Sequence, residues 1–170
     1  IGKAKKDTLY QLFDNFTLFY FLFIDGNSIK DQQFWSRSIG GNAFNVWSGL
    51  AFERICFQHV EQIKMALGIS GVMSSVYSWV YRPASKEESG VQIDMLIDRN
   101  DGVINLCEIK FSQGKYEIKK KYADDLREKL AVFQSKTETK KSVFTVMITT
   151  EGLTDNEYAG DIQNEVVVND

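Results

Sequence analysis

A pair of strand-like segments on either side of Asn100-Asp101-Gly102 constrains the fold more than any other feature. Residues 91–98 and 103–111 are rich in β-branched and other aliphatic residues, and the polar turn between them predicts a hairpin. Two registers are possible. A two-residue loop, Asn100-Asp101, would mix carboxylate and aliphatic side chains on both faces. A three-residue loop, with Gly102 as the left-handed residue of a bulge, sorts the side chains cleanly.

The three-residue loop predicts two faces of different chemistry. Apart from Asn105 at its margin, one face carries only apolar and thiol side chains: Val91, Ile93, Met95, Ile97, Cys107, Ile109 and Phe111. The other face carries Gln92, Asp94, Leu96, Asp98, Ile104, Leu106, Glu108 and Lys110. A slip of one residue would move every side chain to the other face, so the clean sorting selects this register. It places Asp94 opposite Glu108, and Gln92 opposite Lys110.

Asp94 and Glu108 would then have Cβ atoms about 4.5–5.5 Å apart. Two carboxylates at that distance repel each other. A hard divalent cation such as Mg²⁺, which takes oxygen ligands, would relieve the repulsion, and Lys110 would add a positive charge on the same face. The alternative is a solvent-exposed face with cross-strand ion pairs. Ile104 and Leu106 share the face and argue against it, because they indicate that a helix covers part of it.

The rest of the chain predicts further helices and strands, in the overall order α, α, β, β, β, α, β, β. Helices are expected at residues 7–25, 44–67 and 116–134, and strands at 74–82, 91–98, 103–111, 142–150 and 166–168. The first helix is crowded with aromatic residues and is typical of a docking segment, with Phe13, Phe16 and Tyr20 on one face. Glu53 lies in the apolar first half of the second helix, where a carboxylate needs a partner.

Composition excludes several classes of protein. A net charge of −3 argues against a protein that holds nucleic acid by bulk charge. The chain has no GxxxxGK[ST] motif for ATP, and its single histidine leaves little for zinc or histidine-based catalysis. Its most apolar stretch, residues 16–24, is shorter than the roughly 20 residues of a membrane-spanning helix. We therefore expect a cytoplasmic protein with no membrane partner.

Basic residues are concentrated in one segment. Residues 110–141 contain 10 Lys and Arg against 5 Asp and Glu. The basic residues before and within the third helix are Lys115, Lys119, Lys120, Lys121, Arg127 and Lys129. They form either a solvated surface, paired with acidic neighbours at helical spacing, or a ridge that follows phosphate groups.

Asp94, followed by Glu108-Ile109-Lys110, resembles the motif of the PD-(D/E)xK nuclease superfamily, with Ile93 in place of the Pro in the motif's name. The segments GVQIDMLIDR, INLCEIKFS, KKYADDLREKLAVFQSKT and SVFTVMITTEG resemble one branch more closely: the C-terminal nuclease-like domain of prokaryotic AAA-family ATPases. In that branch, a P-loop ATPase and a winged helix are joined to this domain. The resemblance runs from about Tyr10 to the end of the chain.

The resemblance implies an α/β fold. Its core would be a restriction-endonuclease-like mixed β-sheet of αβββαβ order flanked by helices, with an aromatic-rich helical N-terminal extension. Residues 1–42 would form a helical linker or docking segment, and residues 43–170 the nuclease-like domain. The chain begins at Ile1 rather than Met, so we also expect a piece of a larger protein that holds the ATPase and winged-helix parts.

The same resemblance implies a deoxyribonuclease that uses Mg²⁺ or Mn²⁺ to hydrolyse DNA phosphodiesters. Asp94, Glu108, the backbone carbonyl of Ile109 and the helix residue Glu53 would hold the metal. Lys110 would orient the attacking water and stabilise charge on the phosphoryl oxygens. Phosphate or DNA would be bound by Gln92, Lys115, Lys119, Lys120 and Lys121. The alternative is a catalytically inactive interaction or regulatory domain of the ATPase.

Overall fold

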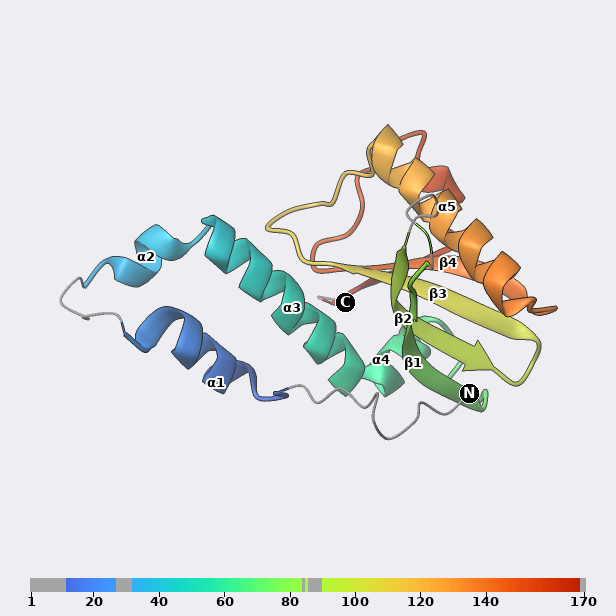
Figure 1. Cartoon of the computed structure of the whole chain (residues 1–170), viewed down its shortest axis with the longest axis horizontal. Coiled ribbons are helices and arrows are strands. Elements are labelled where there is room, and N and C mark those ends of the chain that lie inside the picture. The colour runs from blue at the N-terminus through green and yellow to red at the C-terminus, as the bar shows by residue number, and fades with distance from the viewer. Residues whose placement is uncertain (1–11, 27–31, 84, 86–89, 169–170) are drawn as a thin grey trace. The chain divides into compact units, whose positions relative to one another are not determined.

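The structure is a computed structural model that describes residues 12–26, 32–83, 85 and 90–168 (Figure 1). The chain divides into two compact units, Ile1–Arg54 and Ile55–Asp170. This boundary lies near the end of helix α3 (Asn42–Gln58). The boundary expected from the sequence, after residue 42, lies at the start of the same helix.

The first unit is helical. Helix α1 (Asn15–Phe19) continues as one π-helical turn, η2 (Tyr20–Ile24), and is followed by α2 (Phe34–Ser38) and the first part of α3. The Asp14 carboxylate caps α1 by accepting the N–H of Thr17 at 2.8 Å. The predicted helix over residues 7–25 is thus confirmed from Asn15 to Ile24. Residues 12–14 are not helical, residues 7–11 lie outside the described residues, and the docking role stays a prediction.

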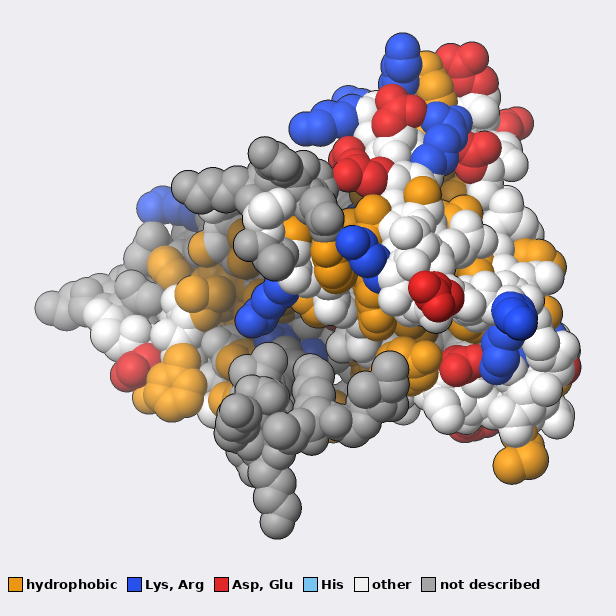
Figure 2. Space-filling model, turned by 45° about the vertical axis from the view of Figure 1, so that its right-hand side comes forward, with side chains coloured by type: hydrophobic (Ala, Val, Ile, Leu, Met, Phe, Trp, Pro, Cys, Tyr) orange, Lys and Arg blue, Asp and Glu red, His pale blue; other side chains and the backbone are white. Residues whose placement is uncertain are grey.

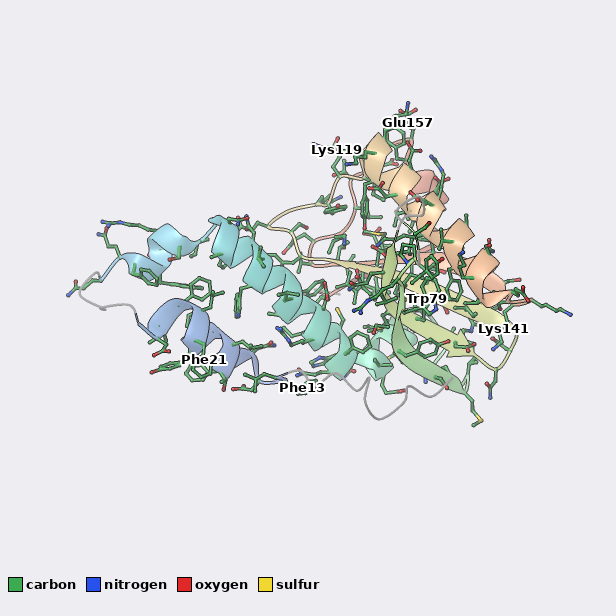
Figure 3. All side chains as sticks on the ribbon, viewed as in Figure 1. Phe13, Phe21, Trp79, Lys119, Lys141 and Glu157 are labelled. Atoms are coloured by element: carbon green, nitrogen blue, oxygen red, sulfur yellow. The ribbon has the colours of Figure 1, made fainter. Side chains whose placement is uncertain are left out.

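Aromatic side chains hold the helices of this unit together. The Phe19 ring lies 5.0 Å from Trp35 and 5.5 Å from Trp47, both in edge-on geometry, which aromatic pairs favour. Several other apolar side chains are exposed, among them Phe13 and Phe21, which are labelled in Figure 3. The exposed set in this segment is Leu12, Phe13, Phe16, Tyr20, Phe21 and Leu22.

The second unit is built on one mixed sheet of five strands. Its strands follow the chain order, β1 (Ser74–Tyr81), β2 (Val91–Arg99), β3 (Val103–Lys110), β4 (Ser142–Thr149) and β5 (Asn164–Val167). The first three strands are antiparallel, and β3, β4 and β5 are parallel. Helix α5 (Lys120–Thr137) makes the crossover from β3 to β4, as parallel neighbours require. The predicted mixed α/β fold is confirmed, and so is the order β, β, β, α, β, β from β1 onward, whereas α2 was not predicted.

The second predicted helix differs in one respect from the structure. It is not continuous over residues 44–67, because the backbone leaves the helical region at His59 (φ −117°) and α4 (Val60–Ala66) begins after it. Gly68, with a φ of +69°, follows the end of α4. Within the described ranges, no helix combines the length and apolar character needed to cross a membrane.

Helix α5 covers one face of the sheet (Figure 1). Its Phe133 packs with Ile104 and Leu106 of β3, and meets Trp79 of β1 edge-on at 5.2 Å; Figure 3 labels Trp79. On the other face, Cys107 is fully buried. Burial raises the pKa of the Cys107 thiol, and the neighbouring Cys56 raises it further, so the last turn of α3 lies against that face.

Candidate functional site

The hairpin that carries the predicted site has the three-residue register. Met95 pairs with Cys107, and Asp98 with Ile104, as the loop Asn100-Asp101-Gly102 requires. Gly102 has a φ of +87°, a left-handed conformation that costs a residue with a Cβ about 1–2 kcal/mol. The register expected from the sorting of side chains is therefore confirmed.

A bulge in β2 interrupts the pairing with β1. Tyr77 pairs with Leu96, but the next pair is Trp79 with Ile93, so Asp94 and Met95 together lie opposite one residue of β1. Such a bulge redirects side chains locally. It places Ile93 in the same apolar cluster as Leu96, although the sequence pattern puts these two residues on opposite faces.

The bulge also moves Gln92 away from its predicted face. Gln92 pairs with Val80, and it is exposed between Val91 and Ile93, which are both buried in the cluster beneath α5. Neighbouring side chains in a strand point to opposite faces. Gln92 therefore does not share the face of Leu96 and Leu106 beneath α5, and its role in binding phosphate stays a prediction.

Asp94, Glu108 and Lys110 lie together where β2 and β3 separate. At this end of the two strands, the last paired residues are Met95 and Cys107. Beyond it, the Ile109 N–H donates to Asp94 Oδ2 at 3.0 Å. Lys110 Nζ lies 3.8 Å from Asp94 Oδ2 and 3.7 Å from Glu108 Oε2. One ammonium group thus stands beside both carboxylates without a close hydrogen bond to either.

Helix α5 supplies two more groups to the same place. Lys129 Nζ donates to both carboxylate oxygens of Glu108, each at 2.7 Å, and Tyr122 Oη donates to Glu108 Oε2 at 3.1 Å. Lys110 Nζ also lies 5.5 Å from the centre of the Tyr122 ring, within the range of a cation–π contact. Glu108 is fully buried, and both of its carboxylate oxygens have hydrogen-bond partners.

Burial and the nearby charge of Asp94 both disfavour the ionised form of Glu108. Burial raises the pKa of Glu108, and the negative charge of Asp94 raises it further, while Lys129 and Lys110 offset part of the rise. Burial also raises the pKa of Tyr122, and the charge of Glu108 adds to this effect, so Tyr122 is a neutral hydrogen-bond donor. A second cationic charge between the carboxylates would favour their ionised forms.

The donor set at this point fits a hard divalent cation in its chemistry. Asp94 and Glu108 offer carboxylate oxygens from two neighbouring strands, and Mg²⁺ is commonly bound by one or two carboxylates together with water and substrate phosphates. The described residues contain no group of three or more His, Cys, Asp or Glu side chains that could hold a metal. A cation at Glu108 also requires an oxygen that Lys129 now uses.

The other predicted site residues lie on α3 and at or before the start of α5. Glu53 lies on α3 within the first unit, and its role stays a prediction. The four lysines before and at the start of α5 are exposed, and Lys119 pairs with Glu117 at 4.0 Å. Figure 2 shows acidic side chains among the basic ones at this end of the unit, and Figure 3 shows Lys119 and Glu157 there. The four are Lys115, Lys119, Lys120 and Lys121.

Sequence reasoning missed the parts played by Lys129 and Tyr122. Lys129 was expected among the surface lysines of the basic segment, yet its side chain is only 22% exposed and contacts Glu108. Its position in the sequence does indicate that it is buried. Tyr122, Leu126, Lys129 and Phe133 follow the spacing of one helical face, so Lys129 interrupts the apolar stripe of α5. A lysine there needs a buried acid as partner.

Comparisons with known proteins add little to this picture. No protein-family profile matches the chain, and neither does any curated protein. A solved structure described as the protein of unknown function AF1548 is similar at 15% identity with a TM-score of 0.44, over 65% of this chain and 55% of that chain. The chain thus spans little more than half the length of that structure.

Proposed function

We propose that this chain is a nuclease-like domain that hydrolyses DNA phosphodiesters with the help of Mg²⁺ or Mn²⁺. The observation that carries the proposal is the position of Lys110 Nζ, 3.8 Å from an oxygen of Asp94 and 3.7 Å from an oxygen of Glu108. Two carboxylates and one ammonium group in a partly covered place are the groups that this reaction needs. The buried carboxylate also distinguishes the arrangement from a solvated polar face, since Glu108 has no exposed surface.

Each group has a distinct role in the proposed reaction. Asp94 and Glu108 would hold the cation, and the Ile109 N–H holds the Asp94 carboxylate in place through a hydrogen bond to Oδ2. A divalent cation, when bound, supplies positive charge to the phosphoryl group and makes water more acidic. Lys110, which is 30% exposed, would donate hydrogen bonds to a phosphoryl oxygen and stabilise the charge that develops there. No side-chain nucleophile is required.

A second candidate function is an interaction or regulatory domain without catalysis. It is favoured by the exposed aromatic side chains of the first unit, such as Phe13 and Phe16, which are 60% and 68% exposed. Exposed apolar side chains in a group are typical of interaction sites. In either case, we propose that the domain works in the cytoplasm beside the AAA-family ATPase and winged-helix parts that the sequence resemblance implies.

Cleavage of plasmid and single-stranded DNA by the full chain, with and without Mg²⁺ or Mn²⁺, tests the first candidate. Asp94→Asn and Lys110→Met should each lower the rate by about 100-fold or more, because each removes a charge that acts in the transition state. Asp98→Asn is a matched control. Asp98 lies on the same strand, but its carboxylate pairs with Lys141 at 2.6 Å, so this variant should keep the wild-type rate.

Two results would contradict the proposal. If cleavage survives both Asp94→Asn and Lys110→Met, the activity comes from elsewhere in the sample. If the wild type binds neither cation and cleaves no DNA, the interaction domain becomes the better description.

A further inference from the structure

Glu108 is the one buried carboxylate of the cluster whose two oxygens are both bound by the same ammonium group. Lys129 Nζ lies 2.7 Å from each oxygen, and Tyr122 adds a third hydrogen bond at 3.1 Å. Glu108 is 0% exposed, whereas the Lys129 side chain is 22% exposed. In this state, Glu108 already has the positive partner that a buried charge requires.

A metal ion and Lys129 would use the same atoms. A cation bound by Asp94 and Glu108 needs at least one oxygen of Glu108, and both now accept from Lys129. Lys110 does not compete in this way, because its Nζ stays 3.7 Å or more from both carboxylates. Lysine has a flexible stem and a strongly hydrated head, and the Lys129 side chain is 22% exposed, so it is already in contact with solvent.

We propose that Lys129 is a displaceable counter-ion, which neutralises Glu108 in the metal-free protein and leaves when a divalent cation binds. The inference rests on the proposed function, because it requires a cation at Asp94 and Glu108. The metal affinity of the site is then the outcome of a competition, and Lys129 sets the concentration of cation at which the site is loaded.

Titration calorimetry of the full chain with MnCl₂ measures this competition directly, without any assay of activity. Lys129→Met removes the competing charge but keeps most of the side-chain volume, so Mn²⁺ should bind at least tenfold more tightly, about 1.4 kcal/mol. Lys129→Arg keeps a permanent charge that can bind a carboxylate through two hydrogen bonds, so Mn²⁺ should bind several-fold more weakly. Lys140→Met removes an exposed lysine and should leave the affinity within twofold of wild type.

Thermal unfolding with and without MnCl₂ gives a second readout. Lys129→Met should unfold at a lower temperature than wild type without metal, because Glu108 has lost its partner, and Mn²⁺ should restore most of the difference. A purely structural role for Lys129 predicts the same loss in both conditions.

The outcomes separate the inference from the function on which it rests. If the wild type binds Mn²⁺ and Lys129→Met binds it equally or more weakly, the competition is refuted while the metal site stands. If neither protein binds Mn²⁺, both are refuted. Binding by Lys129→Met alone would support the inference. If Lys129→Met fails to fold, Lys129→Arg provides the test. A Mn²⁺ affinity of Lys129→Arg equal to or above that of the wild type would overturn the inference.

Discussion

The contact between Glu108 and Lys129 makes a quantitative prediction about stability. In a double-mutant cycle, Glu108→Gln and Lys129→Met are made singly and together, and the coupling energy is the part of their effects that does not add. Glutamine keeps the shape of Glu108 and can still accept from Tyr122, whose hydroxyl lies 3.1 Å away. The cycle therefore isolates the charge pair from its surroundings.

The geometry sets the expected size of the coupling. Unit charges at the observed 2.7 Å attract by about 6 kcal/mol at an effective dielectric constant of 20, and by about 1.5 kcal/mol in water. Glu108 has no exposed surface, but the Lys129 side chain is 22% exposed, so part of the attraction is screened. We expect a coupling energy of about 2–4 kcal/mol, and a cost of about 3–5 kcal/mol for Lys129→Met alone.

Urea unfolding at pH 7 in the presence of EDTA measures the four free energies of unfolding. The pair Asp98 and Lys141 is a matched control, because its atoms are equally close at 2.6 Å while its side chains are 30% and 34% exposed. Solvent screening should reduce its coupling to below about 1 kcal/mol. A Glu108–Lys129 coupling below about 1 kcal/mol, or one no larger than that of the control, would refute the reasoning from burial.

Three further predictions follow from other features. Gly102→Ala should lower the free energy of unfolding by about 1–2 kcal/mol, because Gly102 has a φ of +87°; Gly114→Ala, at a glycine without a positive φ and with open space around it, should cost less in the same urea titration. Burial raises the pKa of Glu108 above its ordinary 4.5, so the folded protein holds more protons and its stability should fall as pH rises from about 4.5; urea unfolding across pH should show this slope in the wild type and not in Glu108→Gln. Cys56 and Cys107 are buried, so iodoacetamide should label both in urea and neither in the folded chain, as read by mass spectrometry.

The hairpin and the proximity of Asp94 to Glu108 could be predicted from the sequence. Alternating side chains and one glycine at position 102 leave a single register that separates the apolar from the polar face, and this register brings Asp94 and Glu108 together. The order of strands and helices was predictable for the same reason, because each segment has its own period of apolar residues.

The bulge in β2 was not predictable from the sequence. Apart from Leu96, residues 91–98 alternate between apolar and polar side chains, and neither Asp94 nor Met95 is a residue that favours a bulge. The bulge depends on how β1 pairs with β2 on both sides of it, and this pairing joins residues that lie far apart in the sequence. The position of Gln92 away from the face of Leu96 and Leu106 follows from this one irregularity.

Lys129 was misjudged for a different reason. Lysines on helices are mostly exposed, so a helix with several lysines is read as a charged surface. The position of Lys129 within the apolar stripe, seven residues after Tyr122 and four before Phe133, outweighs that general tendency. Its partner, Glu108, lies on β3, and only the packing of α5 on the sheet brings the two together.

The grouping of Asp94, Glu108, Lys110 and Lys129 within β2, β3 and α5 has a consequence for biosynthesis. These elements form one continuous run of chain, and contacts between residues close in sequence form quickly because loop closure costs little entropy. Synthesis proceeds from the N-terminus, so the ribosome releases this run before β4 and β5. The nascent chain thus carries Lys129, the cation that pairs with Glu108 in the folded protein, before β4 and β5 are made.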